Sequence, residues 1–138
     1  MPSIEEFEGR WRIARRIDDR RAGAEGRFDG EVVIARGGDG WVYDETGSLS
    51  LGAGAPLTAT RRYLWQALAD GRIAVSFADG RPFHVFDPSA PVPEADHRCQ
   101  PDFYRVRYDF TAWPDWAAEW EVTGPRKDYR MVSTYRRA

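Results

Sequence analysis

The chain has 138 residues, a length that suits one domain with a sizeable core of its own. Aromatic residues make up 14% of the sequence, which excludes an intrinsically disordered chain. The formal net charge is -2, so no basic excess exists to follow a phosphate backbone, and we expect no nucleic-acid partner.

The first residues and the hydropathy pattern favour a cytoplasmic protein with no membrane partner. Residues 1–6 lack the basic and then apolar start of a signal peptide. No apolar run approaches the roughly 18 residues of a membrane-spanning helix. The single cysteine, Cys99, excludes an internal disulfide. The sequence leaves the oligomeric state open.

Taken in chain order, the sequence predicts one short helix followed by strands. Residues 3–8 are expected to be helical, with Ser3 as N-cap and glutamates in the first turn. Apolar and charged residues then alternate from residue 10 to residue 18, which is typical of a half-buried strand. Further strands are predicted at 28–34, 41–45, 48–53, 57–67, 72–78, 82–86, 103–110, 117–123 and 128–136.

Turn-forming residues separate these roughly ten strands at short intervals, as at Gly37–Gly40, Thr46–Gly47 and Asp79–Gly80. We therefore predict an all-β fold, a single closed up-and-down antiparallel β-barrel over residues 1–138, because closure removes exposed strand edges. With an even number of strands, both chain ends meet at the closed end. Every second connection then lies at the open mouth, namely residues 18–24, 46–47, 69–71, 87–101 and 124–128.

The two ends of the chain carry a family resemblance. Gly9 and Trp11 follow the short helix, and Arg136 stands near the end of the last strand. This pattern resembles the lipocalin-like (calycin) barrels, in which an arginine of the last strand packs over a tryptophan of the first. The resemblance implies that Arg136, or failing that Arg137, lies against Trp11.

Four further blocks make the resemblance more specific. They are Arg61–Trp65, Asp79–His84, His97–Tyr104 and Trp120–Tyr129. In order and content they are similar to a bacterial family of unknown function, DUF6314. The resemblance implies a small calycin-like barrel, and it carries no activity or cofactor to transfer.

Alternation along the predicted strands directs one set of side chains into the barrel. This set combines two arginines with tyrosine, tryptophan and one histidine, the composition of a site for a small, partly apolar anion. The predicted ligand-binding residues are Arg15, Arg61, Tyr63, Trp65, His84, Tyr104, Tyr108, Trp120 and Tyr129. In the competing interpretation the aromatic side chains simply fill the barrel, and Arg15 or Arg61 pairs with a carboxylate such as Glu45 or Glu31.

A second set is expected at the mouth of the barrel, where cations would attract anions. It comprises His97, Arg98, Cys99, Arg126 and Lys127. Because these cations stand in turns, charge for solubility is the competing interpretation. His84, His97 and Cys99 also suit zinc or haem iron, a minor alternative beside ordinary loop and core roles. No cofactor is predicted.

Two functional hypotheses follow from the sequence. The first is a barrel that binds an anionic or amphipathic small molecule. The alternative is a small enzyme of isomerase, cyclase or decarboxylase type, with Tyr, His84 and Arg as acid, base and oxyanion partner. The fold alone does not separate the two.

Overall fold

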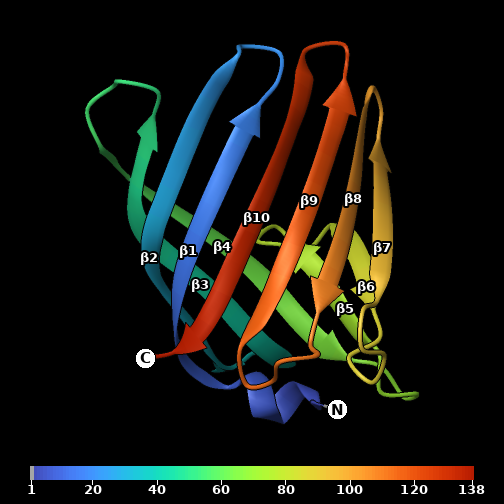
Figure 1. Cartoon of the computed structure of the whole chain (residues 1–138). Coiled ribbons are helices and arrows are strands. Elements are labelled where there is room, and N and C mark those ends of the chain that lie inside the picture. Colours follow the sequence, from blue (N-terminus) through green and yellow to red (C-terminus); the bar gives the residue numbers. More distant parts are fainter. Residues whose placement is uncertain (1) are drawn as a thin grey trace.

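A computed structural model describes residues 2–138 (Figure 1). Met1, the first residue of the predicted domain and of the segment compared with signal peptides, lies outside the described residues. A 3-10 helix, η1 (Ile4–Phe7), precedes ten strands. The strands are β1 (Gly9–Asp19), β2 (Ala24–Gly37), β3 (Gly40–Leu51), β4 (Leu57–Ala67), β5 (Ile73–Phe77), β6 (Pro82–Phe86), β7 (Glu94–Cys99), β8 (Asp102–Asp109), β9 (Trp116–Gly124) and β10 (Lys127–Arg137).

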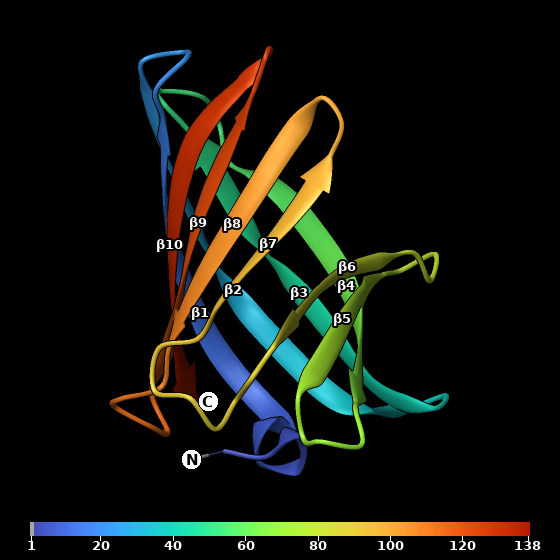
Figure 2. The ribbon, with the colours of Figure 1, turned by 90° about the vertical axis from the view of Figure 1, so that its right-hand side faces the viewer.

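All strand pairs are antiparallel and form one sheet, in the order β6-β5-β4-β3-β2-β1-β10-β9-β8-β7. The pairing of β1 with β10 joins the two ends of the chain, as the barrel prediction required. The two edge strands, β6 and β7, are not paired with each other, and Figure 2 views the molecule from the side of this seam. The predicted all-β class is confirmed, as a nearly closed barrel. Among residues 2–138, no helix has the length and apolar character needed to cross a membrane.

The predicted turn at Thr46–Gly47 is wrong, because β3 runs through it without interruption. Gly47 pairs with Gly30 of β2 at this point. A Cβ atom at Gly30 would collide with the backbone of Thr46, and one at Gly47 would collide with that of Asp29. The glycine therefore permits close approach of two strands rather than a reversal of the chain.

The predicted loop at 87–101 is also wrong, because its second half forms β7. The first error adds a strand and the second omits one, so the predicted total of ten is unchanged. The connections at the open mouth, however, differ from those predicted. Connections 20–23, 52–56, 78–81, 100–101 and 125–126 lie at the open end (Figure 1). The Asp70–Gly71 turn and residues 87–93 instead lie at the closed end, on the side of η1.

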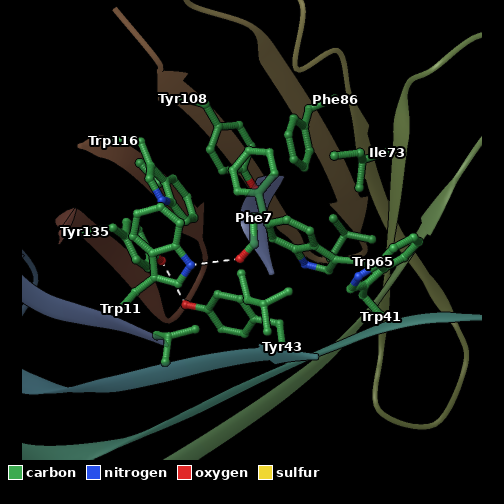
Figure 3. Close-up of a cluster of buried hydrophobic side chains, with 14 of the residues drawn as sticks. Phe7, Trp11, Trp41, Tyr43, Trp65, Ile73, Phe86, Tyr108, Trp116 and Tyr135 are labelled. Carbon is green, nitrogen blue, oxygen red and sulfur yellow. Dashed lines mark hydrogen bonds between the residues drawn. The ribbon is translucent and has the colours of Figure 1, made fainter. Parts of the chain in front are cut away.

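Helix η1 closes the barrel by inserting an aromatic ring. The Glu6 carboxylate accepts a hydrogen bond from the Ser3 backbone N–H at 2.6 Å, which holds the first turn. Phe7 is fully buried, and Trp11 Nε1 donates to its carbonyl oxygen at 2.9 Å. In Figure 3, Phe7 lies among the rings of Trp65, Phe86 and Trp116. This end of the lumen is a packed core.

Trp11 lies under an arginine, and that arginine is Arg137 rather than Arg136. The guanidinium carbon of Arg137 stands 3.9 Å from the centroid of the Trp11 ring. Its nitrogens donate to the carbonyl oxygens of Glu6 and Glu8. Trp11 and Arg137 are direct partners in the β1–β10 register, so their side chains share a face. Arg136 is exposed, 3.6 Å from Asp115, which corrects the first choice of the prediction.

We expect Arg137→Ala to lower the free energy of unfolding by about 2 kcal/mol, because a cation-π contact and charge-assisted hydrogen bonds are lost together. Arg136→Ala removes the same charge from the neighbouring position and should change the free energy of unfolding by less than about 0.5 kcal/mol. Urea unfolding of both variants measures the difference. Equal losses in the two variants would contradict this assignment.

Candidate functional site

A buried ion pair forms the floor of the lumen. Arg15 of β1 and Glu45 of β3 are 7% and 3% exposed. The Arg15 Nη1 and Nη2 atoms donate to the two Glu45 oxygens at 2.8 and 2.9 Å, in the fork-on-fork geometry that suits a guanidinium. Arg15 Nε donates to Ser133 Oγ of β10 at 2.8 Å. Three strands are thus joined through one guanidinium.

Two tyrosines extend this network. The Tyr43 hydroxyl donates to Glu45 Oε1 at 2.7 Å. Since that uses its one proton, the Tyr135 hydroxyl donates in turn to Tyr43 at 2.8 Å (Figure 3). Burial raises the pKa of Tyr135 to about 12 and the pKa of Tyr43 well above its usual value, so both remain donors at neutral pH.

Charge is compensated inside this network. Burial acts to raise the pKa of Glu45, but the hydrogen bonds and charge of Arg15 hold it below its ordinary value. Burial likewise acts against the charged form of Arg15, and Glu45 still keeps the Arg15 pKa above its usual range. Both groups are therefore ionised and paired. A ligand carboxylate would have to displace Glu45 to reach Arg15.

A deep chamber of about 30 Å³ adjoins this floor. Its wall includes Trp65, Val75, Tyr108, Trp116, Ala118 and Trp120. His84 also lines it, with Nε2 2.8 Å from the Tyr108 hydroxyl. The volume suits a group the size of one water molecule.

A break in strand register places His84 there. Val75 of β5 pairs with His84 and Ser76 pairs with Pro82, so Phe83 is an extra residue in β6. Such a bulge turns neighbouring side chains to the same face. As a result, both Phe83 and His84 are buried. Burial, with a smaller effect of the His97 charge, lowers the pKa of His84 to about 3, so its imidazole is neutral at pH 7.

A larger chamber of about 570 Å³ lies toward the open end. Its apolar wall includes Phe77, Phe83, Trp120, Val122 and Met131. Its polar residues are Arg61, Arg62, Tyr63, Asp79, Tyr104, Lys127 and Tyr129, of which Arg62 is paired with Asp44 and Asp79 with Arg81. Arg61, Tyr63 and Trp120 line both chambers, so the two are neighbours.

The cations of this larger chamber differ in their partners. Lys127 Nζ lies 3.1 Å from Asp102 and donates to the Tyr104 hydroxyl at 3.0 Å. Arg61 has only a long contact of 3.4 Å to the Tyr63 hydroxyl. Among residues 2–138, no carboxylate lies within salt-bridge distance of Arg61. Arg61 is therefore the cation of the lumen that lacks a direct counter-ion.

The structure gathers all nine predicted ligand-binding residues around these two chambers. Arg15, Trp65, His84 and Tyr108 line the deep chamber, and Tyr104 and Tyr129 line the larger one. The remaining three, Arg61, Tyr63 and Trp120, line both. Whether these residues bind a ligand stays a prediction.

The predicted mouth residues are more scattered. Lys127 lines the larger chamber, whereas Arg98, Cys99 and Arg126 are exposed and line neither chamber. Arg98 instead lies over the Phe103 ring at 5.1 Å. His97 packs edge-on against Phe83 across the β6–β7 seam, with 5.3 Å between ring centroids.

Sequence reasoning missed two kinds of site residue. Phe77 and Phe83 were not assigned because the β6 bulge breaks the alternation on which the assignment rested. Tyr43 and Tyr135 were not linked to the arginine, although Tyr135 stands opposite Ile13 on the face of Arg15. The signal was present in the sequence, because a residue of β10 that pairs with an inward-facing residue of β1 must also face inward.

For the metal alternative, the two histidines are differently placed. His84 is buried and bound to Tyr108, His97 is half-buried at the seam, and Cys99 is exposed. No three side chains of His, Cys, Asp or Glu come together as metal ligands among residues 2–138. A zinc site therefore has no ligand cluster to support it there, whereas haem held by one histidine needs no such cluster and stays an alternative.

Comparison with known proteins assigns the chain to a family. Residues 7–137 match a family of unknown function, DUF6314. The chain belongs to this family. No curated protein matched the sequence. The structure is similar to that of the S-type phycobiliprotein lyase CPES from Guillardia theta, with a TM-score of 0.67 and 11% sequence identity. The similarity covers 98% of this chain and 90% of the lyase, and at this identity it shows a shared lipocalin-like fold alone.

The buried pair should make Glu45 far more important for stability than an exposed glutamate. Glu45→Gln leaves the Arg15 charge uncompensated in the core, so we expect a loss of about 3 to 5 kcal/mol in the free energy of unfolding. Glu31→Gln breaks the exposed pair with Arg10, whose atoms are 2.6 Å apart, and should cost less than about 1 kcal/mol. Similar losses in the two variants, measured by chemical denaturation, would contradict the structural role given to the Arg15–Glu45 pair.

The buried neutral His84 should make stability fall with acidification. Its pKa is near 6.5 in the unfolded chain and about 3 when folded, so only the unfolded state gains a proton in between. The stability due to neutral His84 is complete above the unfolded value and is lost as pH falls toward 3. Between pH 7 and pH 5 we expect a loss of about 2 kcal/mol from this group.

Urea unfolding at both pH values tests this expectation. His84→Phe should reduce the loss on acidification by that amount, whereas His97→Phe should retain most of it. An unchanged pH dependence in the His84 variant would show that the imidazole titrates normally.

Proposed function

We propose that this protein binds a small, partly apolar anion in the larger chamber, with the anionic group at Arg61. The observation that carries the proposal is Arg61 itself, a lumen-facing cation without a carboxylate partner among the described residues. The other cations of the lumen are already matched, Arg15 by Glu45 and Lys127 by Asp102.

The shape and chemistry of the chamber support an amphipathic ligand. A volume of about 570 Å³ falls in the range of small-molecule sites. Phe83 stacks with Phe77 at 4.4 Å and with Trp120 at 5.2 Å between centroids, giving a continuous apolar wall. Tyr104 and Tyr129 add neutral hydrogen-bonding groups near the mouth. An apolar body with one carboxylate would match each of these features.

The similarity to the phycobiliprotein lyase adds limited support. It indicates that a barrel of this shape occurs in a phycobiliprotein lyase, and nothing about the ligand of this chain. The chamber residues are the basis of the proposal, since sequence identity is 11%.

The test is calorimetric titration with decanoate and with methyl decanoate, which share an apolar chain and differ in charge. We expect decanoate to bind about fivefold more tightly, the effect of one partly exposed ion pair. Arg61→Leu should remove most of this preference. Quenching of tryptophan emission gives a second readout, because Trp120 lines both chambers.

Arg105→Leu is the matched control, since Arg105 is exposed on β8 and lines neither chamber. This variant should retain the preference for the acid. Equal affinity for acid and ester in the wild-type protein, or an acid preference unchanged by Arg61→Leu, would overturn the proposed role of Arg61.

An enzyme is the second candidate function, favoured by the buried contact of His84 with Tyr108 beside the deep chamber. General acid-base catalysis is most efficient when the pKa of the catalytic group lies near the working pH. The pKa of His84 is lowered to about 3 by burial, which makes the imidazole a weak base at neutral pH. Binding therefore ranks above catalysis.

A further inference from the structure

Two residues that line the deep chamber each carry a buried nitrogen atom without a hydrogen-bond partner. The two atoms are His84 Nδ1 and Trp116 Nε1, and neither has a partner among residues 2–138. Their residues are only 7% and 3% exposed. Buried polar atoms without partners are uncommon in folded proteins because each loses its hydrogen bonds to water. Two at one small chamber call for an explanation.

The position of the imidazole proton follows from the contact with Tyr108. If Nε2–H donated to the Tyr108 oxygen, the tyrosine proton would have no acceptor among the described residues, and Nδ1 would lack a donor. If Tyr108 O–H donates to Nε2, only the Nδ1–H is left without a partner. The second arrangement leaves fewer groups unsatisfied. His84 Nδ1–H is then a donor, as the Trp116 indole N–H must be.

We infer that the deep chamber is a binding site for a hydrogen-bond acceptor, a carbonyl-type oxygen at the inner end of the ligand, held by His84 Nδ1–H with Trp116 as a second donor. A volume of about 30 Å³ accommodates one such group and excludes a ring. An apolar end group of equal size would leave the donors unpaired, so the site discriminates by chemistry rather than by shape.

This inference rests on the proposed function and refines it. The two chambers share Arg61, Tyr63 and Trp120 in their walls, so the inner end of a ligand in the larger chamber lies beside the deep one. The ligand class becomes an amphipathic acid that carries a second, neutral oxygen buried away from its carboxylate.

The proton assignment is tested first, without any ligand. Two-bond proton-nitrogen correlation NMR of the 15N-labelled protein at neutral pH distinguishes the two neutral forms of an imidazole. We expect His84 to carry its proton on Nδ1, and Tyr108→Phe to shift it toward the mixed population of a solvated imidazole. A proton on Nε2 in the wild-type protein would overturn the inference.

The recognition step is tested with two matched acids. One is a fatty acid of the length of decanoate that ends in an acetyl group, and the other has an isopropenyl group in its place. They share size, shape and charge and differ in one acceptor oxygen. We expect the acetyl compound to bind about tenfold more tightly to the wild-type protein. His84→Phe should bring this ratio close to one, whereas His97→Phe should leave it unchanged.

The outcomes separate this inference from the proposal on which it depends. If both acids bind with the dependence on Arg61 described above but with equal affinity, the deep chamber is not an acceptor site and the proposed function stands. If both acids bind and neither depends on Arg61, the proposed function fails first. An acetyl preference that persists in His84→Phe would also refute the role given to His84.

Discussion

The ion pair of Arg15 and Glu45 is the constraint around which the lumen is arranged. Two charges buried at 7% and 3% exposure are stable only where every polar atom around them is matched. Ser133, Tyr43 and Tyr135 supply those partners from β10 and β3. Because Ser133 stands on β10 and Glu45 on β3, the network holds β1 in place beside β10 and joins it across the lumen to β3, which is not its neighbour in the sheet.

The same network divides the barrel into a closed and an open half. Toward η1 the interior is filled by Phe7, Trp11 and the rings around them. On the other side the two chambers open toward the mouth. Since Glu45 neutralises Arg15, the positive charge that faces the larger chamber comes mainly from Arg61. The floor therefore sets both the depth of the site and the place of its charge.

The sequence predicted the first and last strands well and the middle of the chain less well. Alternation from residue 10 to residue 18 identified the inward faces of Trp11 and Arg15, because regular strands with one buried face obey a period of two. The same rule applied to β10 would have favoured Arg137 over Arg136, since Tyr135 already faces inward. The total of ten strands was correct only because two opposite errors cancelled.

Those errors have distinct physical causes. Gly47 is read as a turn residue because glycine is common in turns, yet here two glycines stand opposite each other so that two backbones can approach. Strand β7 was overlooked because its sequence, EADHRC, is polar on both faces, as expected for an edge strand with little buried surface. Neither close approach across strands nor edge position is visible in a local window of sequence.

The structure of the candidate site shows why Phe83 was missed beside His84. At the β6–β7 seam the wall is held by side chains, with His97 and Phe83 in contact, instead of a backbone ladder. A strand without a partner on one side can accept an extra residue, and the bulge at Phe83 lies on such a strand. That bulge turns His84 inward beside Phe83, where regular alternation would allow only one of them. The irregular part of the wall thus places the imidazole against Tyr108, while the regular strands opposite place Arg15 and Glu45. The proposed binding of an acceptor oxygen in the deep chamber depends on both parts of the wall.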